Sequence, residues 1–169
     1  MNLKGKKEST DGGRNAVRIS RDYDFPRETV FRMFTDPRKA VKFFGPEGAV
    51  KLLFELDPRP GGSIRIHDRD SEGNTGKTSG TITEIVVPEL LVFRSATTFF
   101  SAATPEKGGV PWEALQTIKF EALGPRKSRV TVLVQVLATG SFPGGVQALE
   151  EGYMSGWGET LDMLDRELR

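Results

Sequence analysis

Two neighbouring ionisable residues, His67 and Asp68, are candidates for acid–base chemistry in this sequence. In the alternating segment 63–69, Asp68 falls on the same side as Ile64 and Ile66, and His67 falls on the other side. A carboxylate that faces the interior needs a charged partner, or its pKa rises. The alternative is that the strand ends in solvent at Asp68. His67 has a side chain whose ordinary pKa of about 6.5 suits acid–base work. The alternative is that His67 lies on the outer strand face and takes no part in such chemistry.

The sequence offers little for metal, phosphate or nucleophilic chemistry. With one histidine and no cysteine it lacks the clusters that usually bind metals, so we expect no metal and no cofactor. The segment from Arg59 to Gly62 has the glycines of a phosphate-binding loop, but no Lys-Ser/Thr pair follows and it joins two strands. We therefore interpret it as a tight turn. No G-x-S-x-G motif supports acyl transfer.

Two further polar residues are candidates for contact with a ligand. Gln116 lies on the strand face that also carries Ala114, Ile118 and Phe120, so it is a candidate neutral hydrogen-bonding group inside an apolar pocket. Arg94 is a candidate for receiving an anionic ligand head, although arginines are mostly exposed.

These residues require a sheet to position them. Alternating residues, interrupted by proline and glycine turns, predict an antiparallel meander that follows two short helices after the first strand. The long segment 99–112 is predicted to be a loop, with Phe99 and Phe100 at its base. The predicted strands are 16–23, 50–57, 63–69, 78–87, 90–98, 113–122 and 128–137, and the short helices begin at Pro26 and Pro37 and end at Asp36-Pro37 and Gly45-Pro46.

The C-terminal segment from Gly144 to Arg169 has the period of an amphipathic helix that lies on the sheet by one face. Its apolar stripe consists of Val146, Leu149, Tyr153, Trp157, Leu161, Leu164 and Leu168. Glu150 projects within this stripe, where it is either a polar anchor or an acid favoured by the helix dipole. The helix also contains Gly152, Gly156 and Gly158, each costing about 1 kcal/mol relative to alanine. Either Gly156 allows close approach to the sheet, or the missing side chains leave room for a ligand beside Trp157.

Length and charge place this chain among ordinary one-domain proteins. It has 169 residues, with 24 basic and 23 acidic side chains, so nothing in its charge points to nucleic acid. No apolar stretch is long enough for a membrane span and no signal sequence is evident, so we expect a cytoplasmic protein without integral membrane contact. Residues 1–14 are polar and are predicted to be a disordered tail before a single domain over 15–169.

Four segments together resemble one family. In order and spacing they are similar to the activator of heat-shock protein 90 ATPase homologues, within the START and Bet v 1-like helix-grip superfamily. The segments are DFPRETVFRMFTDPRKAVKFFGPEG at 24–48, ELDPRPGGSIRIHDRDSEG at 55–73, GTITEIVVPELLVF at 80–93 and EGYMSGWGETLDMLDREL at 151–168. The resemblance implies an α+β helix-grip fold, with a curved seven-stranded antiparallel sheet around the last helix and an apolar cavity between them. Relatives usually carry a large apolar residue where this sequence has Asp68.

The resemblance also indicates which functions we expect and which we do not. The chaperone activity belongs to members with an additional N-terminal domain and its ATPase-stimulating motif, which this sequence lacks, so a heat-shock protein 90 partner is not expected. The leading hypothesis is binding of an apolar or amphipathic small molecule, of the lipid or aromatic class, by a monomer or homodimer. Its candidate ligand-binding residues are Ile66, Asp68, Phe93, Gln116, Phe120, Glu150, Tyr153 and Trp157.

Two alternatives stay open at this stage. An enzyme would use Asp68, His67 or Glu150 as acid or base on a bound small molecule. An interaction module would use Phe99 and Phe100, the aromatic segment 43–46 or the helix ends to contact another protein.

Overall fold

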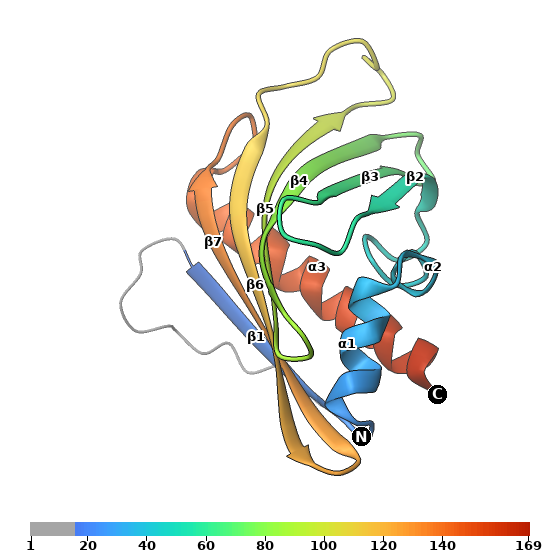
Figure 1. Ribbon diagram of the computed structural model, residues 1–169. Coiled ribbons are helices and arrows are strands. Elements are labelled where there is room, and N and C mark those ends of the chain that lie inside the picture. The colour runs from blue at the N-terminus through green and yellow to red at the C-terminus, as the bar shows by residue number, and fades with distance from the viewer. Residues whose placement is uncertain (1–15) are drawn as a thin grey trace.

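A curved antiparallel sheet surrounds one long helix in the computed structural model, which describes residues 16–169 (Figure 1). The strand order is β1-β7-β6-β5-β4-β3-β2, so six strands form a meander and the first pairs with the last. This confirms the predicted α+β helix-grip fold. The predicted tail, residues 1–14, lies outside the described residues. The strands are β1 (Ala16–Tyr23), β2 (Val50–Leu56), β3 (Ser63–Arg69), β4 (Thr75–Val86), β5 (Leu90–Phe100), β6 (Trp112–Gly124) and β7 (Lys127–Ala138).

Prolines determine where the first two helices begin. Pro26 precedes α1 (Arg27–Thr35) and Pro37 begins α2 (Pro37–Ala40), positions at which a missing N–H loses no helical hydrogen bond. α2 is shorter than predicted, because after Ala40 the chain continues in turns instead of helix. The long helix α3 (Gly145–Leu168) agrees with the predicted one. No helix in the described part of the chain is long and apolar enough to cross a membrane.

The turn after β3 extends the sheet beyond its predicted limits. The Asp70 carboxylate accepts hydrogen bonds from the backbone N–H groups of Glu72 and Asn74, both at 2.9 Å, which closes a tight turn. Strand pairing therefore resumes at once, with Thr75 opposite Phe100. The predicted loop over 99–112 is reduced to 101–111.

Packing under the sheet is uneven. α3 packs chiefly against β1 and β7, and the Tyr23 hydroxyl of β1 donates a 2.8 Å hydrogen bond to the Leu161 carbonyl. One face of β7 carries valines that lie in this core, with Val130, Val132 and Val134 fully buried. α1 covers β6 and β7. The concave side of β3, β4 and β5 lies farther from the helix, and this is where space remains.

Candidate functional site

A cavity of about 530 Å³ lies between α3 and the concave face of the sheet. Its buried walls include Ile64, Ile66 and Phe93 from the sheet and Leu149 and Trp157 from α3. It reaches solvent near the end of β5, where Phe99 lines it and is 49% exposed. Small-molecule sites typically measure about 300–1,000 Å³ and are mostly apolar, so both the size and the walls fit such a site.

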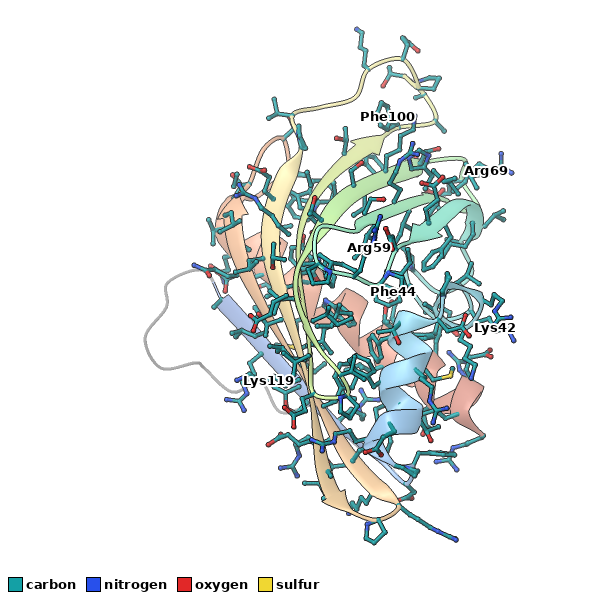
Figure 2. All side chains as sticks on the ribbon, viewed as in Figure 1. Lys42, Phe44, Arg59, Arg69, Phe100 and Lys119 are labelled. Carbon is teal, nitrogen blue, oxygen red and sulfur yellow. The ribbon has the colours of Figure 1, made fainter. Side chains whose placement is uncertain are left out.

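Phe44, on the segment after α2, separates this cavity from the filled core. It lies between the helices and the sheet, whereas Lys42 nearby projects outward (Figure 2). The Phe44 ring meets Trp157 edge-on at 5.8 Å and Phe34 at 5.7 Å. Phe34 in turn contacts Phe120 at 5.2 Å, so aromatic rings fill the α1 side. The open space begins where Phe44 and Trp157 end this cluster.

Two of the four glycines of α3, Gly152 and Gly156, line the cavity. A Cβ atom at Gly156 would meet no heavy atom within 4 Å, and one at Gly152 would lie 3.5 Å from Phe142 Cζ, an ordinary contact. Close approach to the sheet therefore does not explain Gly156, and that interpretation was wrong. The exposed residues Ser155 and Glu159, which the helical pattern places opposite the apolar stripe, also border the cavity because it runs along the flank of α3.

A chain of neutral hydrogen bonds crosses the buried end of the cavity. The Trp157 indole N–H donates to Gln116 Oε1 at 2.8 Å, and Gln116 Nε2 donates to Ser95 Oγ at 3.0 Å. All three residues are more than 90% buried. Because an indole can only donate, it fixes which end of the Gln116 amide is the acceptor. Gln116 thus holds one amide N–H toward Ser95 and keeps a second.

Tyr153 adds a phenol to the same wall. Burial raises the pKa of Tyr153 to about 12, against the smaller opposite effect of hydrogen bonding by the neighbouring Trp112 and Ser95 side chains. Its hydroxyl is therefore protonated at any ordinary pH and remains a hydrogen-bond donor.

Asp68 faces the cavity and is paired with Lys51, which regular alternation along β2 would place on the other face of the sheet. Lys51 Nζ lies 2.7 Å from Asp68 Oδ1, and both side chains are mostly buried. The contact is an ion pair without hydrogen-bond geometry, and the attraction between two charges at this distance does not require that geometry. A β-bulge at Leu52 shifts the register between Lys51 and Leu53, which brings Lys51 opposite Asp68. The expected charged partner of Asp68 is thus present.

The other two acid–base candidates lie outside the cavity walls. His67 faces the opposite side of the sheet, beside Lys77 and Arg65. Partial burial, and then these two cations, lower the pKa of its imidazole. Glu150 is half-buried on α3 and does not line the cavity. His67 and Asp68 therefore cannot act together on one bound molecule.

The family model for activator of Hsp90 ATPase homolog 1-like protein matches residues 24–169. The chain belongs to this family. The match includes every cavity-lining element, since the cavity begins at Phe44 and ends on α3. No match to a curated protein was found.

Solved structures support the family assignment at the level of the fold. A protein from Nitrosomonas europaea has 25% identity and a TM-score of 0.71, with 90% of this chain and 93% of that chain covered. A protein from Chromobacterium violaceum also has 25% identity, with a TM-score of 0.70 and coverage of 90% and 95%. A family protein from Silicibacter pomeroyi, at 22% identity, has a TM-score of 0.72 and coverage of 90% and 96%.

The helix-grip architecture of this family brings most of the predicted contact residues to one place. Those that line the cavity are Ile66, Asp68, Phe93, Gln116, Tyr153 and Trp157. Phe120 does not, because its ring is buried against α1, and Glu150 does not either. Whether the six contact a ligand stays a prediction.

Sequence reasoning missed Ser95 and Lys51. Ser95 follows Phe93 at the two-residue spacing of one strand face, so its place beside the cavity had a signal in the sequence. Lys51 had none, because its position depends on the bulge.

The two phenylalanines proposed for an interaction surface point to opposite sides of β5. Phe99 borders the cavity, whereas Phe100 lies at the foot of the long loop (Figure 2). The Lys77 ammonium lies 4.8 Å from the centre of the Phe100 ring, and a Cβ at Gly108 would be only 2.5 Å from that ring. Phe100 is thus partly covered by its own chain.

Proposed function

We propose that this protein binds an apolar or amphipathic small molecule in the cavity between the sheet and α3. The observation that carries the proposal is Gly156, whose missing side chain opens onto the cavity. Glycine inside a helix costs about 1 kcal/mol relative to alanine, and no packing contact within 4 Å requires it here. Gly156 is exposed and lines the cavity, so the glycine leaves space free on the solvent-facing flank of the cavity.

The walls provide the driving force for such binding. Burying apolar surface contributes about 25 cal/mol per Å², so a ligand that buries roughly 300 Å² against Ile66, Phe93 and Trp157 gains about 7.5 kcal/mol before the entropic cost of association. The few polar groups at the buried end serve orientation. This division between apolar walls and convergent polar groups is typical of small-molecule sites.

Gly156→Leu tests the proposal by filling the cavity from the helix side. The probe is 1-aminoanthracene, an uncharged aromatic fluorophore whose emission rises in apolar surroundings. We expect the wild-type protein to take up one probe molecule per chain, and Gly156→Leu to bind it at least about tenfold more weakly because leucine occupies the ligand volume.

Gly158→Ala is the matched control on the same helix. Gly158 does not line the cavity, and a Cβ there would lie 4.0 Å from Ile19 Cδ1. This variant should bind the probe like wild type. If the wild-type protein takes up no probe, or if Gly156→Leu binds it with unchanged affinity while remaining folded by circular dichroism, the proposal is wrong.

A further inference from the structure

The charged residues that border the cavity are acidic in the described part of the chain. They are Asp68, Asp70 and Glu159, and no lysine, arginine or histidine lines it there. Lys51 approaches from β2, but its ammonium is paired with Asp68. Arg94, a candidate for an anionic head group, lies on the outer face with its guanidinium 3.4 Å from Glu113. An anion entering the cavity meets carboxylates and finds no free cation among these groups.

Among the described residues, the side chains at the buried end of the cavity are uncharged. Gln116, Ser95 and Trp157 are buried and joined by neutral hydrogen bonds. A ligand carboxylate that reached them would lose its water shell without gaining an opposite charge, and neutral hydrogen bonds do not make up that loss. A neutral ligand avoids this penalty.

Hydrogen-bond direction further restricts the neutral group. The Trp157 indole occupies one acceptor site on Gln116 Oε1, and the Gln116 amide keeps one N–H that donates to no group within residues 16–169. Nearby, the Trp112 indole hydrogen-bonds Tyr153, and because an indole can only donate, the Tyr153 oxygen accepts this bond and its O–H remains a donor. Tyr153 and Gln116 both line the cavity, so the Tyr153 O–H and the second Gln116 N–H are donors offered at this end, and the matching ligand group is an acceptor.

From these three observations we propose that the cavity selects uncharged apolar molecules bearing a carbonyl oxygen, such as aromatic ketones, esters or quinones, and rejects the corresponding carboxylates. The carbonyl accepts hydrogen bonds from Tyr153 and Gln116 at the buried end, and the apolar body lies against Ile66 and Phe93. This inference rests on the proposed function and narrows its ligand class.

Three naphthalenes of nearly equal size test the selectivity. They are 2-acetylnaphthalene, which has a carbonyl, 2-ethylnaphthalene, which has no acceptor, and 2-naphthoate, which is anionic. Each is titrated against protein-bound 1-aminoanthracene at a pH where the naphthoate is ionised. We expect the ketone to bind about 3- to 10-fold more tightly than the ethyl compound, and the naphthoate at least about tenfold more weakly than the ketone.

Tyr153→Phe removes the hydroxyl while the ring stays. We expect the ketone to lose about 3- to 10-fold in affinity and the ethyl compound to be unchanged. Tyr23→Phe is the matched control, because its hydroxyl bonds to the Leu161 carbonyl outside the cavity. An equal loss for all three compounds in Tyr153→Phe would mean that the residue only maintains the fold, and would overturn the hydrogen-bonding role.

The outcomes separate this inference from the function on which it rests. Equal affinities for the three naphthalenes, or tightest binding of the naphthoate, overturn the selectivity and leave small-molecule binding in place. Failure of the wild-type protein to take up even 1-aminoanthracene overturns both.

Discussion

Gln116 connects the two elements that form the buried end of the cavity. Its amide accepts a hydrogen bond from Trp157 on α3 and donates one to Ser95 on β5. A polar group buried without a partner costs about 1–3 kcal/mol, so this residue supports the fold as well as the cavity.

Gln116→Leu should therefore reduce the free energy of unfolding by about 1–3 kcal/mol, because it leaves the Trp157 indole N–H and the Ser95 hydroxyl without this partner. The measurement is urea denaturation followed by circular dichroism. Gln135→Leu is the control, since Gln135 is exposed on the outer face of β7 and its loss should change stability by less than about 0.5 kcal/mol. Equal effects of the two substitutions would contradict the role assigned to Gln116.

His67 should make the protein less stable in mild acid. Because its pKa is lowered in the folded state, the unfolded chain binds more protons, and stability falls as the pH drops from about 6.5 toward the folded pKa. Asp22, Asp36 and Asp70 have lowered pKa values too, but carboxyl groups shifted below 3.8 lose their contribution only in stronger acid.

His67→Gln should thus flatten the dependence of stability on pH between about pH 5 and 6.5 and leave it unchanged at higher pH. Thermal denaturation across that range checks this. A variant whose stability follows the wild-type pH dependence throughout would show that His67 does not titrate differently on folding.

At the residue scale, the sequence predicts the strand face on which a side chain lies better than it predicts the residues that the side chain contacts. Gln116 was assigned to an interior strand face from alternation alone, and the structure places it there. Its hydrogen bond to Trp157 joins positions 41 residues apart, and a local sequence pattern cannot predict a contact over that separation. The partner of Asp68 was even less accessible, because one extra residue at Leu52 reverses the side to which Lys51 points.

α3 is the element on which the proposed function depends most. Its apolar stripe was predicted from the 3.6-residue period, and Leu149, Trp157, Leu161 and Leu164 are buried as expected. The period does not show how far the helix stands from each strand. Whether a glycine on its flank meets backbone or empty space depends on that distance, which sheet curvature sets.

Substituting alanine for two glycines tests this distinction at the level of elements. Gly156→Ala should raise the free energy of unfolding by about 0.4–1 kcal/mol, because alanine favours the helix and its Cβ enters open space. Gly62→Ala should lower it by more than about 1 kcal/mol, since a Cβ there would lie 2.0 Å from the Asp57 carbonyl oxygen. Chemical denaturation distinguishes the two, and destabilisation by Gly156→Ala would mean that the space beside it is filled.

At the scale of the whole molecule, uneven packing creates the cavity. α3 lies against β1 and β7 and α1 against β6 and β7, so the concave surface of the middle strands is left uncovered. The order of elements and the curved sheet were predictable, because turn residues and alternation mark each strand and the family resemblance supplies the topology. The cavity volume was not predictable, because it is the difference between the space that the curved sheet encloses and the volume of the side chains that fill this space.

The two tryptophans of this chain, Trp112 and Trp157, both line the cavity, so their indole N–H signals report on it directly. The most direct test of ligand binding is a ¹H–¹⁵N correlation spectrum recorded while 1-aminoanthracene is added. We predict that both indole signals shift and saturate together in the wild-type protein and stay in place in Gly156→Leu. Indole signals that do not move in the wild-type protein, at probe concentrations that change other resonances, would contradict binding in this cavity.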